Sequence, residues 1–138
     1  SVKEQSDGLG RLGIFSRPVT LEQLALDIKR DLKLPHIRII GPSDRIISRA
    51  VVCTGSGGSL VEAFVRTDAD VFITGDLKYH EARRVEEAGR TAVDAGHFGS
   101  EHMAIDLITD QLTRSFESAG LEIEMIKFQQ EKDPFTIV

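Results

Sequence analysis

The sequence predicts a single α/β domain with a mixed, mostly parallel sheet and flanking helices, and three observations lead to this fold class. From Cys53 onward, short apolar runs alternate with glycine-bearing turns and amphipathic helices, in a β-α-β-α-β-α-β series after an N-terminal helix. Continuous apolar strands that alternate with helices favour a parallel sheet with right-handed crossovers. With 138 residues, of which 41% are hydrophobic, the chain is long enough for one core and too short for two of ordinary size.

The N-terminal part of the chain contains one clear helix signal. Residues 1–18 are rich in glycine and charge, so we expect a linker or an edge segment there, with the α/β domain spanning 19–138. Thr20 and Gln23 form a capping-box pattern, and Pro35 is expected to end the helix. The residues spaced to form its buried face are Leu21, Leu24, Ala25, Ile28 and Leu32.

Runs typical of strands make up much of the remainder. Residues 37–40 and 46–53 are β-rich and flank a turn signal at 41–44, so we expect two adjacent strands. The later strands are expected at 50–54, 71–74, 91–94 and 121–128, with helices that start near Ser59, Asp76 and Gly99. Because the carboxyl ends of parallel strands share one edge of a sheet, functional groups are expected in the three loops that follow these strands.

The composition argues against several classes of protein. The net charge of −5 gives no electrostatic reason to expect nucleic acid as a partner. No apolar run approaches the roughly 18 residues of a membrane span, and the N-terminus lacks a signal or transit pattern, so we expect a cytoplasmic location and no membrane partner. The lone Cys53 lies in an apolar run and is expected to be a small buried side chain rather than a nucleophile.

The first loop is a glycine-rich turn between a strand and a helix. Its residues are Gly55, Ser56, Gly57, Gly58 and Ser59. Free N–H groups at such a turn can hold an anion or a phosphorylated substrate, whereas the simpler interpretation is a tight turn. The fingerprint is incomplete, because Leu60 occupies the last glycine position of a dinucleotide motif and no P-loop lysine follows. We expect Ser59 and Glu62 to cap the helix.

The second loop carries Asp76 and His80, four residues apart near a predicted helix start. At that spacing the two side chains share one helix face, with β-carbons about 5–6 Å apart. A carboxylate and an imidazole so placed can share a metal ion or relay a proton. The alternative is structural: Asp76 would be the N-cap of the helix and His80 a partly exposed side chain.

The third loop carries His97 and Glu101, which are also four residues apart. Imidazole and carboxylate are the ligands of catalytic zinc, manganese and non-haem iron sites. Two such pairs on successive loops of one sheet edge could converge on a single cleft. His102 is expected to face solvent, and His36 belongs to no constellation.

Three ordered motifs carry a family resemblance. They are the glycine-rich turn at 55–59, the Gly-Asp-x-x-x-His motif with Asp76 and His80, and the Asp-Ala-Gly-His-x-x-Ser-Glu motif with His97 and Glu101. From about Gly8 to its end, the chain resembles the C-terminal half of the Nif-three-like proteins, often labelled GTP cyclohydrolase I type 2 homologues. The resemblance implies a pair of divalent ions (Zn, Mn or Fe) in a cleft, with His97 and Glu101 as two ligands. It places Asp76 and His80 nearby, supporting the ligands or acting as acid and base.

The resemblance also implies partners that complete the site. The remaining ligands in the family come from an N-terminal half with a His-His-Pro type motif and a further Asp, and this chain contains no adjacent histidines. Because such sites usually need at least three protein ligands, the isolated chain is expected to bind metal weakly or not at all. The family also implies a homo-oligomer, a hexamer of two stacked trimers.

These observations lead to a metal-dependent, hydrolase-like protein as our first hypothesis. Two ions would polarise a nucleotide or phosphoester substrate, with His97 and Glu101 as ligands and His80, steered by Asp76, moving protons. The isolated chain would then be inactive. The first alternative is a metal-stabilised scaffold or protein-interaction factor without turnover. The second is a small nucleotide-binding module that uses Gly55 to Ser59.

Overall fold

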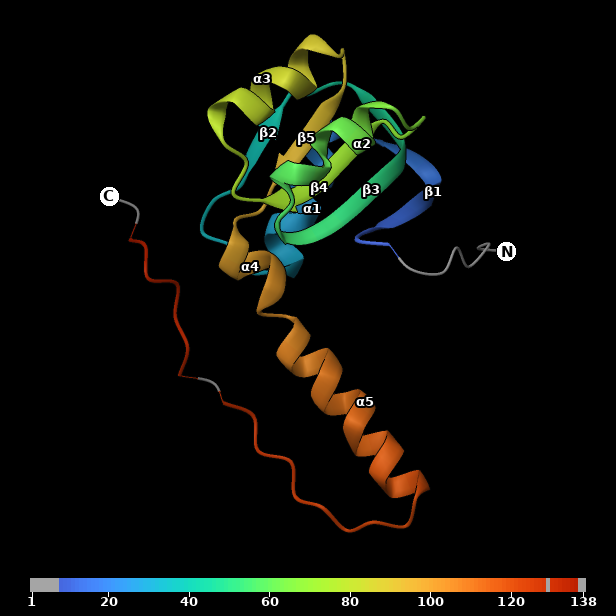
Figure 1. Cartoon of the computed structure of the whole chain (residues 1–138), viewed down its shortest axis with the longest axis vertical. Coiled ribbons are helices and arrows are strands. Elements are labelled where there is room, and N and C mark those ends of the chain that lie inside the picture. Colours follow the sequence, from blue (N-terminus) through green and yellow to red (C-terminus); the bar gives the residue numbers. More distant parts are fainter. Residues whose placement is uncertain (1–7, 129, 137–138) are drawn as a thin grey trace.

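The computed structural model describes residues 8–128 and 130–136 and contains a five-stranded mixed sheet. The sheet order is β1-β3-β4-β5-β2. The strands are β1 (Arg11–Thr20), β2 (Arg38–Ile40), β3 (Ile46–Ser56), β4 (Val71–Gly75) and β5 (Thr91–Asp94). The three central strands are parallel, and the edge strands β1 and β2 run antiparallel to their neighbours (Figure 1). The predicted mixed, mostly parallel sheet is confirmed.

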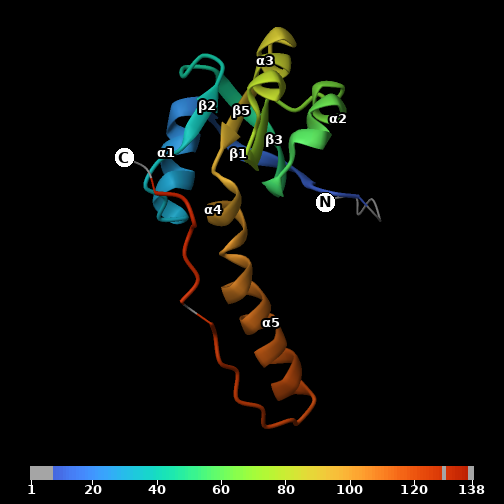
Figure 2. The same ribbon diagram turned by 60° about the vertical axis from the view of Figure 1, so that its left-hand side comes forward.

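Helices cover both faces of this sheet. Helix α1 (Leu21–Asp31) lies on one face, and α2 (Val61–Val65) and α3 (Tyr79–Glu87) lie on the other (Figure 2). The short 3₁₀ helix η1 (Gly58–Leu60) leads into α2, and α4 (His97–Glu101) follows β5. Helix α5 (Ala104–Ser118) then projects away from the sheet in both views (Figures 1 and 2).

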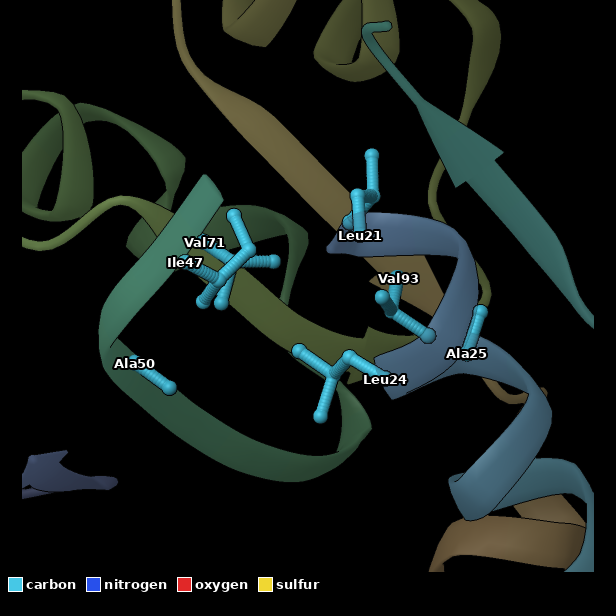
Figure 3. Packing of buried hydrophobic residues seen from close by; sticks show 7 residues of the cluster. All are labelled: Leu21, Leu24, Ala25, Ile47, Ala50, Val71 and Val93. Carbon is cyan, nitrogen blue, oxygen red and sulfur yellow. The ribbon is translucent and has the colours of Figure 1, made fainter. Parts of the chain in front are cut away.

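Two apolar clusters hold the layers together. The cluster between α1 and the sheet consists of Leu21, Leu24, Ala25, Ile47, Ala50, Val71 and Val93 (Figure 3). The cluster on the opposite face consists of Val61, Phe64, Ala69, Phe72, Leu77, Val85 and Ala92. Successive strand residues such as Val71 and Phe72 thus point to opposite faces, and both are fully buried. This explains why the central strands are continuously apolar.

Helix α1 begins where its sequence signal predicts and ends earlier than predicted, with Leu32 as its C-cap. The hydroxyl of Thr20 accepts a hydrogen bond from the backbone N–H of Gln23 at 3.1 Å, as an N-cap does. Only this half of the capping box forms, because the side-chain amide of Gln23 donates to Asp27 instead. The helix ends at Asp31, ahead of Pro35.

The expectation that 37–40 and 46–53 form adjacent strands is wrong. Strand β2 pairs antiparallel with β5, at the opposite side of the sheet from β1. Both edges of β3 are occupied by β1 and β4, so β2 cannot pair with β3, and it lies at the outer edge of β5 instead. This pairing sets Arg38 directly opposite Asp94, which matters for the site described below.

The predicted last strand, at 121–128, is also wrong for the chain as described. No strand is assigned there, because α5 carries this segment away from the sheet and from any strand edge (Figure 1). Its apolar side chains, such as Ile126 and Phe128, are exposed. The only ion pairs it makes within the described part of the chain join Lys127 to Asp106 and Asp110 on α5.

The N-terminal segment contributes an edge strand. Residues 11–18, for which the sequence predicts a linker or an edge segment, belong to the edge strand β1. Residues 1–7 lie outside the described residues. Among the described residues, none of the helices combines the length and the apolar character needed to cross a membrane.

Candidate metal centre

The loops after β3, β4 and β5 meet at the carboxyl edge of the parallel strands. The backbone N–H of Gly55 donates to the hydroxyl of Ser100 at 2.9 Å, which joins the first loop to α4. A β-carbon on Gly75 would lie 2.5 Å from the carbonyl carbon of Gly96, so the second and third loops are in backbone contact. This packing brings the residues from three sequence motifs to one place.

His97 and Glu101 form the side-chain pair that the spacing predicts. Helix α4 starts at His97, directly after Gly96, whose φ of 75° favours glycine. Nε2 of His97 lies 3.1 Å from Oε2 of Glu101, and the side chains are 49% and 51% exposed. The pair is therefore ordered by one helical turn, yet open to solvent.

The backbone of Gly55 lies directly against the His97–Glu101 pair. A β-carbon there would overlap the Glu101 carboxylate and would lie 3.4 Å from Nε2 of His97, and the φ of Gly55 is +68°. The buried hydroxyl of Ser100 also donates to the carbonyl of His97 at 3.0 Å. The first loop thus packs on the imidazole and carboxylate, which is a contact that sequence spacing did not predict.

The structure favours the tight-turn interpretation of residues 55–59. The N–H groups of Gly55 and Gly57 donate to the hydroxyls of Ser100 and Thr74, so they are committed to protein oxygens. The expected cap by Ser59 and Glu62 is wrong. Helix α2 starts at Val61 without a side-chain cap, and the Glu62 carboxylate accepts from Arg84 instead. That hydrogen bond lowers the pKa of Glu62. Ser56 and Ser59 are exposed.

Asp76 faces His97 rather than His80. Oδ1 of Asp76 accepts a hydrogen bond from the backbone N–H of His97 at 3.1 Å, and Oδ2 lies 3.6 Å from Nδ1 of the ring. The expected Asp76–His80 pairing on one helix face is wrong. Helix α3 begins only at Tyr79, with Lys78 as its N-cap, so Asp76 lies in the preceding loop with a φ of 53°.

His80 is on the exposed surface of α3. Its side chain is 76% exposed, and Nε2 lies 3.9 Å from Oε1 of Glu81. The same Glu81 accepts from the N–H of Lys78 at 2.8 Å, which completes the start of the helix. The structure therefore gives His80 a carboxylate neighbour, although not the predicted one.

Asp94 is the residue of this region whose role the sequence analysis missed. It ends β5, is 3% exposed, and accepts hydrogen bonds from the N–H groups of Asp76, Leu77 and Gly96 and from Arg38. The available signal was a carboxylate at the end of an apolar strand, since a buried charge requires several donors.

The other singled-out residues take structural places. His102 is exposed, as expected, and its ring stacks on Phe98 with centroids 4.7 Å apart. His36 is exposed, and Cys53 is partly buried against the second apolar cluster. Within 8–128 and 130–136, no group of three His, Cys, Asp or Glu side chains is arranged to hold a metal ion.

Fold and site together define a mixed α/β domain that presents an imidazole–carboxylate pair at the carboxyl edge of its parallel strands. The chain belongs to the Duf34/NIF3 (NGG1p interacting factor 3) family, whose model matches residues 1–134. This is the family that the three sequence motifs indicate, so the resemblance is confirmed.

Individual relatives match nearly the whole chain. It is 30% identical over 131 residues to the GTP cyclohydrolase 1 type 2 homolog of Bacillus subtilis, which covers 95% of this chain and 35% of that protein. It is 31% identical to the protein NIF3 homolog of Schizosaccharomyces pombe, covering 99% of this chain and 49% of that protein. The chain therefore spans about a third to a half of the length of these relatives.

A solved structure supports the same assignment. The chain is similar to the crystal structure of Staphylococcus aureus protein SA1388, with a TM-score of 0.89 and 31% sequence identity. The match covers 95% of this chain and 42% of that protein. The five-stranded mixed sheet with flanking helices is thus a fold that this chain shares with solved members of the family.

Proposed function

We propose that this chain supplies two ligands, His97 and Glu101, to a dinuclear divalent-metal site in a hydrolase-like protein. The observation that carries the proposal is the 3.1 Å separation between Nε2 of His97 and Oε2 of Glu101 at a solvent-open sheet edge. The names of the relatives in Bacillus subtilis and Staphylococcus aureus support a hydrolase-like class, since both are called GTP cyclohydrolase 1 type 2 homologs.

The donor atoms fit a divalent transition metal. Nitrogen and oxygen ligands lie about 2.0–2.2 Å from zinc, so two of them on one ion are about 3–3.5 Å apart. The separation of the His97 and Glu101 donor atoms lies in that range. An imidazole and a carboxylate suit zinc, manganese or iron.

Asp76 supports this pair by orienting the imidazole. A ligating histidine usually directs its other ring nitrogen to a carboxylate, and Oδ2 of Asp76 lies 3.6 Å from Nδ1 of His97. The backbone N–H of His97 also donates to Asp76, so this carboxylate touches both the ring side and the start of α4. With Nδ1 facing Asp76, Nε2 of the ring faces Glu101.

The chemistry of such a site follows from its charges. A bound divalent ion supplies Lewis-acid polarisation of the substrate, for which we propose a nucleotide or another phosphoester. His97 and Glu101 would be two of the ligands of that ion. The exposed imidazole of His80 is our candidate for moving a proton. A His80→Gln variant should then keep metal affinity and lose turnover.

The rest of the ligand set must come from outside the described residues. In this proposal it comes from the part of the longer relatives that the chain does not match, an N-terminal half of the same protein, within a homo-oligomer. The exposed apolar side chains Leu107, Ile108 and Leu112 on α5 offer a surface for such packing.

The experiment is a calorimetric titration with Zn²⁺ or Mn²⁺. It compares the full-length wild-type protein with a His97→Ala/Glu101→Ala double variant, and it uses His102→Ala as the matched control. We expect the double variant to lose about 100-fold or more in affinity, and His102→Ala to behave as wild type. Equal affinity and stoichiometry in the wild type and the double variant would refute the ligand assignment.

The second candidate is a metal-stabilised interaction factor without turnover. The family description, NGG1p interacting factor 3, and the apolar surface of α5 favour it. A panel of nucleotides and phosphoesters, assayed with and without chelator, separates the two candidates. Chelator-sensitive turnover supports the enzyme, whereas metal-dependent assembly without turnover supports the interaction factor.

A further inference from the structure

The buried carboxylate of Asp94 connects the second and third loops. Oδ1 accepts from the backbone N–H groups of Asp76 and Gly96, both at 3.0 Å. Oδ2 accepts from the N–H of Leu77 at 3.0 Å and from the guanidinium of Arg38 on β2. With four donors on two oxygens, this buried charge is well compensated. The donors come from both loops at the candidate centre and from an edge strand.

These hydrogen bonds flank an unusual backbone conformation at Asp76. Its φ of 53° is in the left-handed region, which is uncommon outside glycine, although aspartate and asparagine adopt it more often than other residues. The N–H groups of Asp76 and Leu77 both donate to Asp94, so the turn between them is set from outside the loop. This turn directs the Asp76 carboxylate toward the N–H and the ring of His97.

The Asp94 carboxylate also fixes the backbone next to His97, the partner of Asp76 in this contact. The N–H of Gly96, which immediately precedes His97, donates to Oδ1 of Asp94. The Asp94 side chain thus holds both Asp76 and the start of α4, the helix that carries the His97 imidazole. Arg38, directly opposite Asp94 in the antiparallel pair of β2 and β5, balances the charge.

We infer that Asp94, held by Arg38, is a positioning residue that sets the orientation of Asp76 against His97. Its functional meaning rests on the proposed metal site, because orientation of the imidazole decides whether Nε2 and the Glu101 carboxylate can share an ion. The positioning itself is a property of the described chain and can be measured without metal.

The test is amide hydrogen exchange, followed by NMR, in the 138-residue chain and its Asp94→Asn variant. Asparagine keeps the size of the side chain, but its NH₂ group cannot accept the bonds that one carboxylate oxygen accepts. We expect exchange of the Asp76 and His97 amides to become about tenfold faster or more. The N–H of His97 donates to Asp76 and not to Asp94, so its faster exchange would report reorientation of Asp76.

Asp70→Asn is the matched control. Oδ2 of Asp70 accepts from the N–H groups of Ser48 and Arg49 at 2.8 and 2.9 Å, at the opposite end of the same sheet. This variant should accelerate exchange at those two amides and leave Asp76 and His97 unchanged. If Asp94→Asn affects Asp76 and His97 no more than Asp70→Asn does, the positioning role is overturned.

A milder pair of variants covers the case in which Asp94→Asn fails to fold. Arg38→Met removes the cation and leaves three backbone donors on Asp94, so we expect about threefold faster exchange at Asp76 and His97. Arg38→Lys should restore the wild-type rates. Wild-type exchange in Arg38→Met would overturn the inference.

Zinc titration of the full-length protein tests whether the positioning by Asp94 matters for metal binding. Asp94→Asn should bind zinc about 10–100-fold more weakly than wild type, and Asp70→Asn should match wild type. Unchanged affinity in an Asp94→Asn protein with loosened loops would refute the functional meaning of the positioning, namely that it serves metal binding. A wild type that binds no zinc would refute the proposed function alone, and the exchange rates would still decide the positioning.

Discussion

Replacing Gly55 by alanine tests how closely the first loop packs on the His97–Glu101 pair. The added methyl group would overlap the Glu101 carboxylate and force an alanine into a φ of +68°. The left-handed backbone alone costs an alanine about 1–2 kcal/mol. Displacement of the carboxylate adds to this, so we expect Gly55→Ala to lower the free energy of unfolding by about 2–3 kcal/mol.

Gly89→Ala separates the two contributions. Gly89 has a similar φ of +65°, but a β-carbon there meets nothing within 4 Å. In urea unfolding we expect Gly89→Ala to lose about 1 kcal/mol, and in zinc titration we expect it to match the wild type. Gly55→Ala should bind zinc at least about tenfold more weakly, because Glu101 must move. Equal stability losses in both variants, together with wild-type zinc affinity in Gly55→Ala, would refute this account of the site.

Three further predictions follow from named contacts. Asp76→Asn should weaken zinc binding about tenfold in calorimetry, since Asp76 faces the His97 ring; unchanged affinity would contradict its orienting role. Phe64→Ala should cost about 3–5 kcal/mol in urea unfolding, because Phe64 is 1% exposed and stacks on Phe72; a loss below about 1 kcal/mol would contradict the assigned core. The hydrogen bond from Lys127 lowers the pKa of Asp106 below its ordinary value of 3.8. The contact between α5 and residues 121–128 therefore contributes stability at pH values above 3.8, and this stability is lost as the pH falls through the lowered pKa. NMR contacts across this pair should fade in that acid range, and a Lys127→Met variant that keeps them at neutral pH would contradict the assignment.

Local features of the site were predictable because they depend on a few neighbouring residues. The four-residue spacing places His97 and Glu101 one helical turn apart independently of the rest of the chain. In the structure, Nε2 of His97 lies 3.1 Å from Oε2 of Glu101. The Thr20 cap is equally local, since its hydroxyl bonds an N–H three residues away.

Asp76 illustrates why the remainder of the site could not be predicted. Spacing alone pairs it with His80, on the assumption that the helix starts at the end of the strand. The helix starts later, and Asp94, eighteen residues away, bends the loop so that Asp76 turns to His97. A contact across that separation depends on which strands are neighbours, which no local pattern encodes.

The sequence by itself determined the alternation of apolar strands and helices, the mostly parallel sheet and the imidazole–carboxylate pair. These follow from periodicity and from the geometry of single helices and strands. Only the tertiary structure decided that β2 pairs with β5, that residues 121–128 form no strand and that Asp94 joins two loops. Each of these depends on which strand edges and hydrogen-bond donors are free once the sheet has assembled, and that is a property of the packed molecule.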